Sequence, residues 1–227
     1  MQIFFIRHAQ SENNALYDLT GTSDGRNIDP KLTPLGEKQA ELLAGYLRQH
    51  RSEFPFTHLY CSLMVRAVAT AVFVARELNL PLVAWVDLHE EGGIYLRDDA
   101  TGELIGQPGN GRSFFREHYP EVILPETLDE SGWWNRPFEP TAERELRARR
   151  FLEELRKRHG RKQDNVALIS HGGFYNLVMA ELLKPEKKGN IWFSLNNTAI
   201  SRLEINENQT NIRFQNRVSW MPQEMIT

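Results

Sequence analysis

One short segment near the start of the chain constrains its fold and its chemistry more than any other. Residues 3–6 read Ile-Phe-Phe-Ile, an apolar run without alternation, and the run stops at Arg7 and His8. Such a run is typical of a central strand covered on both faces, and open α/β sheets bind ligands at the carboxyl ends of these strands. The pair at that end combines a planar cation with a side chain that is a neutral nucleophile near pH 7. We therefore expect a phosphoryl ligand here.

A second segment repeats this pattern. On its own, an arginine and a histidine after a strand are more often a salt-bridged strand end than an active site. Residues 166–169, however, read Val-Ala-Leu-Ile, and they are followed by Ser170, His171 and two glycines that open a helical pattern. Glycines let the backbone approach a ligand closely, and the N–H groups at the start of a helix favour an anion. Two strands that end in histidine therefore indicate one shared phosphate site.

The two histidine segments belong to a series of five short motifs along the chain. Residues 7–11 read Arg-His-Ala-Gln-Ser, with Asn14 six residues after His8, and residues 32–40 read Leu-Thr-Pro-Leu-Gly-Glu-Lys-Gln-Ala. The other three motifs are Ser-Leu-Met-Val-Arg-Ala-Val-Ala-Thr-Ala at 62–71, Leu-His-Glu at 88–90 and Ser-His-Gly-Gly at 170–173. In this order they resemble the motifs of the histidine phosphatase superfamily, the group that includes the cofactor-dependent phosphoglycerate mutases. The resemblance extends over most of the chain.

The resemblance implies a three-layer α/β fold, in which a mostly parallel central sheet carries helices on both faces. We expect a single domain over residues 1–227, with an irregular insertion or lid at about 92–140 that covers the site. Trp133 and Trp134 lie in this insertion. They could form a wall of the substrate site, but we favour a small core that lets the insertion hold its shape.

The resemblance also implies the roles of four side chains in phosphoryl transfer. His8 would be the nucleophile that forms a covalent phosphohistidine. Arg7, Arg66 and His171 would neutralise the phosphoryl oxygens, because stabilising spread negative charge is most of what catalysis of this reaction requires. Arg66 lies in the first turn of a predicted helix, where the helix dipole disfavours a cation unless an anion binds nearby.

The acid of the reaction is expected after a strand over residues 82–88. By the Leu-x-Glu spacing of the family, Glu90 would protonate the leaving alcohol and then deprotonate the attacking water. Glu91 is adjacent, and the residues alone leave it as an alternative. Asn14 and the backbone N–H of Gly172 would add hydrogen bonds to the phosphate.

Two departures from the family pattern bear on the reaction. Ala9 stands where the family usually has glycine, which would cost about 1 kcal/mol or more if that position required a positive φ. The mutases of the family keep a Gly-Trp segment in the first loop and Asn-Glu-Arg-His-Tyr-Gly at the acid. Here residues 20–29 hold no aromatic and the acid motif reads His-Glu-Glu-Gly-Gly at 89–93. We therefore predict a phosphatase, with a mutase-type phosphotransferase and a catalytically silent phospho-ligand-binding module as alternatives.

Composition and charge exclude several other classes of protein. A net charge of -3 gives no general attraction to nucleic acid or anionic membrane. The basic run at 156–162 is expected at a helix C-terminus followed by glycine, so we do not interpret it as a nucleic-acid patch. A single cysteine, Cys61, excludes an internal disulfide framework. With no signal peptide and no membrane-length apolar stretch recognised, we expect a cytoplasmic protein.

The remaining expectations concern ligands, partners and local structure. The His and Glu residues lack a zinc-type spacing such as His-Glu-x-x-His, so we expect neither a metal nor a cofactor. The expected partner is a small phosphorylated substrate, and the sequence leaves a homodimer open. The polar stretch from 14 to 31 predicts a long loop beside the site. A helix from Thr141 is predicted with Leu146 inward and its arginines outward. Residues 199–205 and 212–218 predict an edge hairpin.

Overall fold

A seven-stranded sheet forms the centre of the computed structural model, which describes residues 1–160, 163–184, 191–206 and 209–227. Its strand order is β6-β3-β2-β7-β1-β8-β9, parallel from β6 to β1 and antiparallel from β1 to β9. The strands are β1 (Gln2–Arg7), β2 (His58–Cys61), β3 (Leu82–Ala84), β6 (Val122–Ile123), β7 (Asn165–Ser170), β8 (Ile200–Ile205) and β9 (Thr210–Arg217).

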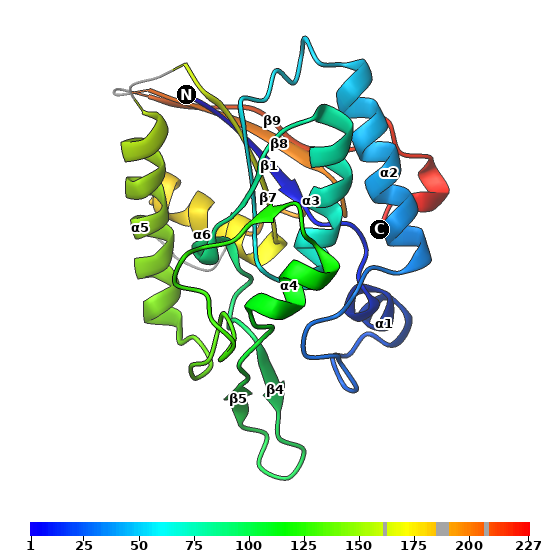
Figure 1. Ribbon diagram of the computed structural model, residues 1–227, viewed down its shortest axis with the longest axis vertical. Helices are drawn as coiled ribbons and strands as arrows, with labels where there is room; N and C mark the ends of the chain where they lie inside the picture. The colour runs from blue at the N-terminus through cyan, green and yellow to red at the C-terminus, as the bar shows by residue number, and fades with distance from the viewer. Residues whose placement is uncertain (161–162, 185–190, 207–208) are drawn as a thin grey trace.

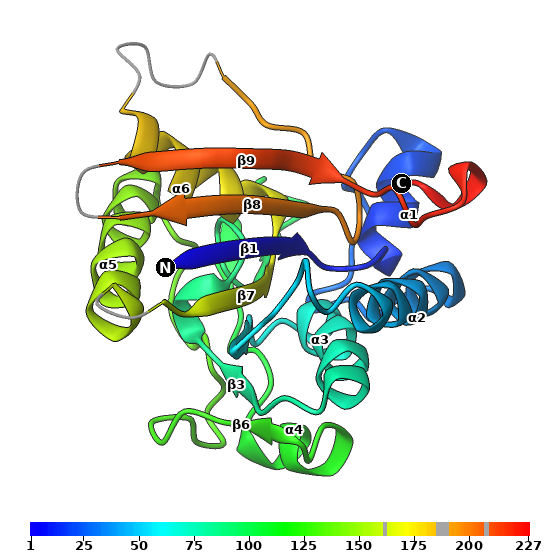
Figure 2. The same ribbon diagram turned by 90° about the horizontal axis from the view of Figure 1, so that it is seen from above.

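Helices cover both faces of this sheet. Helices α2 (Pro34–Gln49) and α3 (Val65–Leu78) lie on one face, and α5 (Thr141–His159) and α6 (Gly172–Leu183) lie on the other (Figures 1 and 2). The smaller elements are α1 (Glu12–Thr20), the hairpin β4 (Tyr95–Arg97) and β5 (Leu104–Gly106), α4 (Arg112–His118), and the 3-10 turns Val86–Leu88 and Gln223–Met225. The predicted three-layer, mostly parallel α/β fold is confirmed. Among the helices of the described ranges, none combines the length and the apolar character that crossing a bilayer requires.

Strand β1 belongs to both hydrophobic cores. Phe4 and Ile6 are buried in the core under α2 and α3, whereas Ile3 and Phe5 are buried in the core under α5 and α6. Because successive side chains of a strand point to opposite faces, an apolar run without alternation is what such a position requires.

The register of the parallel strands brings the two histidine segments together. Arg7 is paired with Ser170 across β1 and β7, so both strands end at the same level of the sheet. The backbone N–H of His8 continues the ladder by donating to the carbonyl oxygen of Ser170 at 2.9 Å. His8 and His171 therefore follow neighbouring strands at one edge.

The insertion after β3 is built into the main body of the fold. Strand β6 pairs in parallel with β3 and forms one edge of the central sheet. Trp133 and Trp134 are buried, and they belong to the same core as Phe4 and Ile6. The tryptophans therefore pack in a core, as favoured, but the prediction of a separate small core within the insertion is wrong.

Three local expectations differ from the structure. The predicted loop over 14–31 begins with helix α1, because Ser11 caps it in a capping box with Asn14 and Gly21 ends it in the left-handed conformation. The strand predicted over 82–88 ends at Ala84 and continues as a 3-10 turn. In α5, Leu146 is exposed and Arg147 is buried, the reverse of the expectation. Part of the basic run (161–162) and part of the predicted hairpin turn (207–208) lie outside the described residues.

Candidate active site

A cavity of about 350 Å³ opens at the carboxyl end of β1. This volume is at the lower end of the range for ligand pockets, which suits a small metabolite. Six of the seven predicted site residues line it: Arg7, His8, Asn14, Arg66, Glu90 and Gly172. The seventh, His171, does not line the cavity. Its side chain is fully buried next to His8, and the two ring centroids are 5.0 Å apart. The two imidazoles thus lie together on the same side of the sheet.

The His8 ring is held in one tautomer and one orientation. Its Nδ1 lies 2.7 Å from the carbonyl oxygen of Ala9, and its Nε2 lies 3.0 Å from Nε of Arg66. Since a carbonyl only accepts hydrogen bonds, Nδ1 carries the proton and Nε2 keeps its lone pair. Burial lowers the pKa of His8 well below its ordinary value, and the nearby Arg66 and Arg7 lower it further. The ring is therefore neutral near pH 7, as a nucleophile must be.

His171 presents the opposite nitrogen. Its Nε2 lies 2.9 Å from Oγ of Ser62, which also accepts a hydrogen bond from the backbone N–H of Met64. The hydroxyl proton of Ser62 can then be donated to Nε2, which leaves the proton of His171 on Nδ1. That nitrogen is buried and has no hydrogen-bond partner among the described residues. Because buried polar atoms are nearly always paired, this unpartnered nitrogen beside the ring of His8 makes His171 a candidate donor to a ligand oxygen. Burial again lowers the pKa of His171 well below its ordinary value.

Two of the three arginines that line the cavity, Arg7 and Arg66, act electrostatically on His8. Arg7 is anchored through a hydrogen bond from Nη1 to the carbonyl oxygen of Leu195. Burial lowers the pKa of both Arg7 and Arg66, and the carboxylate of Glu90 opposes this effect. Because the arginine side chain is not deprotonated in proteins, both guanidinium groups remain cations. The cavity therefore offers two fixed charges to an anion.

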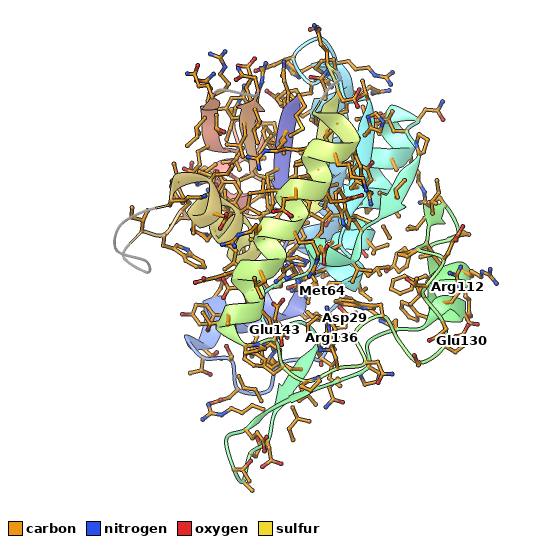
Figure 3. The ribbon with its side chains drawn as sticks, turned by 90° about the vertical axis from the view of Figure 1, so that its left-hand side faces the viewer. Asp29, Met64, Arg112, Glu130, Arg136 and Glu143 are labelled. Atoms are coloured by element: carbon orange, nitrogen blue, oxygen red, sulfur yellow. The ribbon has the colours of Figure 1, made fainter. Side chains whose placement is uncertain are left out.

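Asp29 is a charged residue near Arg66 that the sequence did not indicate. Its Oδ1 accepts a hydrogen bond of 3.0 Å from the backbone N–H of Val65, and Figure 3 shows Asp29 beside Met64 at the start of α3. Burial raises the pKa of Asp29 to about 6, against the effect of Arg66. Its carboxylate also accepts a hydrogen bond from Asn110, which links the first loop to the insertion.

Glu90 is bound to the amino end of α6. Its Oε1 accepts from the N–H of Phe174 at 2.9 Å, and its Oε2 accepts from the N–H of Gly173 at 3.2 Å. A Cβ on Gly173 would lie 2.4 Å from Oε1, so only glycine allows this approach. Glu91 instead pairs with Arg144 at 2.9 Å and does not line the cavity. Of the two acids, Glu90 is the one that faces the site.

Arg147 holds the segment that carries Glu90, although the helix pattern predicted that it lies on the solvent side. It forms a bidentate pair with Glu139, at 2.7 and 2.8 Å, and donates from Nη1 to the carbonyl oxygens of Asp87 and His89. A signal for its burial exists, because Arg147 stands four residues before Phe151 and eight before Leu155, on the buried stripe of α5.

The other residues of the first motif have mainly local partners. Oδ1 of Asn14 accepts from the N–H of Ser11 at 3.1 Å and lies 3.3 Å from Nδ2 of Asn197. Ala9 does not adopt a positive φ, and its N–H donates to Oγ1 of Thr70 at 3.0 Å. The alanine therefore carries no steric cost at this position.

The mouth of the cavity is formed by residues that sequence reasoning missed. Tyr17 and Trp192 line it with more than half of each side chain exposed. Arg26 lines it as well, with Nη1 donating to the hydroxyl of Tyr95 at 2.6 Å and the guanidinium 4.3 Å above the same ring. Its buried Nε has no hydrogen-bond partner among the described residues. The mouth of the cavity therefore combines the exposed rings of Tyr17 and Trp192 with the guanidinium of Arg26, which Tyr95 holds in place.

Comparisons with known proteins add to this geometry. A family model described as the histidine phosphatase superfamily (branch 1) matches residues 3–218. Phosphoserine phosphatase 1 of Hydrogenobacter thermophilus is 29% identical over 177 residues, which cover 75% of this chain and 71% of that protein.

Solved structures resemble the chain over nearly its whole length. Phosphoserine phosphatase from Entamoeba histolytica, in complex with 3-phosphoglyceric acid, has a TM-score of 0.62 at 21% identity and covers 96% of this chain and 98% of that one. A putative alpha-ribazole-5'-P phosphatase from Escherichia coli has a TM-score of 0.64 at 22% identity, with 96% and 97% covered. At these identities the likeness is one of fold.

Proposed function

Because the chain belongs to the histidine phosphatase superfamily, we propose that it is a phosphatase that hydrolyses a small phosphomonoester through a covalent phosphohistidine on His8. The observation that carries this proposal is the orientation of His8. Its neutral ring holds the Nε2 lone pair beside Arg66 at the cavity wall, while Ala9 fixes the proton on Nδ1.

In the first step, Nε2 of His8 attacks the phosphorus atom. The N–P bond forms as the bond from phosphorus to the leaving oxygen breaks, and Glu90 supplies the proton that the leaving alcohol requires. Arg7, Arg66 and the Nδ1–H of His171 neutralise the phosphoryl oxygens. The imidazolium character that His8 acquires is stabilised by its hydrogen bond to the carbonyl oxygen of Ala9.

In the second step, water attacks the phosphohistidine. Glu90, now a carboxylate, takes a proton from the water, the N–P bond breaks and inorganic phosphate forms. Asn14 and the N–H of Gly172 contribute hydrogen bonds to the phosphate in this scheme, since both residues line the cavity. The two steps balance without any co-reactant other than water.

The mouth supports a more specific substrate class. We infer that the leaving alcohol carries an anionic group, which Arg26 binds, and an apolar or aromatic part, which packs against Trp192 and Tyr17. Aromatic surfaces contribute large contact areas, and an arginine held by Tyr95 is positioned for a carboxylate or a second phosphate.

A direct test is hydrolysis of p-nitrophenyl phosphate in the presence of EDTA. We expect the wild-type protein to release inorganic phosphate, His8→Ala to release none, and His118→Ala, which removes an exposed histidine of α4, to match the wild type. A brief reaction with labelled substrate should leave acid-labile label on the wild-type protein alone. Retention of full activity by His8→Ala would overturn the proposal.

The same assay separates the alternative functions. A mutase would move phosphate between the hydroxyls of phosphoglycerate faster than it releases inorganic phosphate. A silent module would be stabilised by phosphorylated ligands without turnover. For the substrate class, a panel of phosphomonoesters with and without a second anionic group should show that Arg26→Ala raises KM only for the doubly anionic ones. An equal rise for all substrates would contradict the role of Arg26.

A further inference from the structure

A second cluster of histidine and acidic side chains lies at the edge of the sheet opposite the active site. His58 opens β2, His159 ends α5 and Asp164 immediately precedes β7. Because β2 and β7 are parallel neighbours, their starts lie together, as their ends do at the active site. From Asn165 to His171 the chain advances six residues along the strand direction, or about 20 Å. The cluster is therefore remote from the phosphate cavity.

The potential ligand atoms of this cluster converge. One ligand atom from each of the three side chains lies within 4.8 Å of the others. The Nδ1 of His159 is 2.7 Å from Oδ2 of Asp164, and the Nδ1 of His58 is 3.9 Å from the same oxygen. In a tetrahedral zinc site with bonds of about 2.0–2.1 Å, neighbouring ligand atoms are roughly 3.3 Å apart. These two separations lie on either side of that value and the remaining pair lies within 4.8 Å, so the side chains would have to move to close around an ion.

The surroundings of the cluster also suit a metal ligand set. Nε2 of His159 lies 3.2 Å from the hydroxyl of buried Tyr60, and a metal-bound histidine usually gives its second nitrogen such a partner. Nδ1 of His58 lies 2.9 Å from Oγ1 of Thr57. That hydroxyl also bonds the backbone of Asn165 in both directions, so it keeps its partners if His58 turns to a metal.

We propose that His58, His159 and Asp164 form a binding site for Zn²⁺ or a similar divalent transition metal. Two imidazoles and one carboxylate are ligands that zinc accepts, whereas Ca²⁺ and Mg²⁺ require sites built from oxygen. His58 is 38% exposed, which gives an ion a route from solvent and leaves a coordination position for water. The ion would join the end of α5 to the starts of β2 and β7, in a stabilising role separate from catalysis.

Titration of the full chain with ZnCl2 and with CoCl2 tests this proposal. We expect one zinc ion to bind in the calorimeter and cobalt to give the visible absorption of a tetrahedral site. His58→Ala should weaken zinc binding by about 100-fold or more. Tyr60→Phe, which removes only the hydroxyl that contacts Nε2 of His159, should weaken it by about tenfold. Phosphatase activity should be unchanged in His58→Ala. A large excess of MgCl2 should not displace the zinc.

Two controls assign the ion to this cluster. His118→Ala removes an exposed histidine elsewhere, and His8→Ala removes one from the phosphate cavity; both should bind zinc as the wild type does. Asp164→Asn, which keeps the size of the side chain, guards against a folding defect in the alanine variants and should also weaken binding. Unchanged affinity in both His58→Ala and Asp164→Asn would overturn the proposal. So would loss of the zinc in His8→Ala, or no binding by the wild type.

Discussion

Nε of Arg66 lies 3.0 Å from Nε2 of His8, so the cation and the nucleophile of the proposed reaction are in direct contact. The contact has two effects. Arg66 acts with burial to keep His8 neutral, and its Nε–H donates to the Nε2 lone pair, which holds the unprotonated nitrogen against the guanidinium at the cavity that both residues line. An incoming phosphate would replace the imidazole as the partner of the guanidinium. The same side chain therefore organises the free site and stabilises the transferring group.

Replacement of Arg66 by lysine should reduce activity strongly. Lysine keeps the charge but lacks the planar fork of N–H donors that can bind phosphoryl oxygens in a bidentate manner. We expect kcat to fall by about 100-fold or more, the scale of losing one transition-state donor. The control is Arg76→Lys, because Arg76 lies on the same helix, is exposed and pairs with Glu121. Similar kinetics for the two variants would contradict this role.

Replacement of Glu90 by glutamine should affect poor leaving groups most. Glutamine keeps one oxygen that can accept from the N–H of Phe174, but its NH2 group cannot accept from the N–H of Gly173, and it cannot donate a proton as a carboxylic acid does. We expect a loss of about 100-fold for an alkyl phosphate and a much smaller one for p-nitrophenyl phosphate, whose leaving group needs little protonation. Glu91→Gln should lose little with either substrate, since Glu91 lies outside the cavity lining. Equal sensitivity of both substrates would exclude Glu90 as the acid.

Replacement of Arg147 by methionine should destabilise the protein. The change leaves the carboxylate of Glu139 buried without its bidentate partner and frees the carbonyl oxygens of Asp87 and His89. Breaking a buried pair in this way costs about 3–5 kcal/mol. Urea unfolding measures this loss, and Arg149→Met, at an exposed position of the same helix, should stay within about 0.5 kcal/mol of the wild type. A neutral Arg147→Met would show that the segment before Glu90 is held by other contacts.

Stability should fall as the pH drops below about 6.5. Burial lowers the pKa of His8, His89 and His171 well below the ordinary value, so the unfolded chain takes up protons that the folded protein does not. Each such histidine lowers the free energy of unfolding by up to about 1.4 kcal/mol per pH unit. Asp29, whose pKa is raised to about 6, takes up a proton in the folded protein and so offsets the loss of stability from only one of the three histidines. Denaturant unfolding at pH 7, 6 and 5 should show this decline, and a constant value would contradict it.

The parts of the site that sequence could predict are those encoded by local patterns. Strands β1 and β7 are predicted by their apolar runs. Because the two strands are parallel neighbours, the residues that follow them lie at the same edge of the sheet. Arg66, the second residue of α3, could be located because it belongs to the motif at 62–71 that carries the family resemblance. In each case a few consecutive residues form the pattern, and the order of the five motifs along the chain turns these patterns into one site.

The parts that sequence missed depend on contacts between distant segments. Arg147 looks like one of many arginines on α5, and only its partners Glu139, Asp87 and His89 explain its burial. Arg26 acquires its place at the mouth from Tyr95, 69 residues away in the chain. Helix α1 was missed for a different reason, since polar composition outweighed the capping signal at Ser11.

The pairing of β6 with β3 determines how this protein can be re-engineered. The two residues of β6, Val122 and Ile123, come from the insertion, yet they form an edge of the central sheet. Trp133 and Trp134, further along the insertion, pack in the main hydrophobic core. Replacing the whole insertion by the corresponding segment of a relative would therefore also replace part of the central sheet and of the main core. Chimeras that leave β6, Trp133 and Trp134 in place and vary only the β4–β5 hairpin should retain the wild-type midpoint of thermal melting.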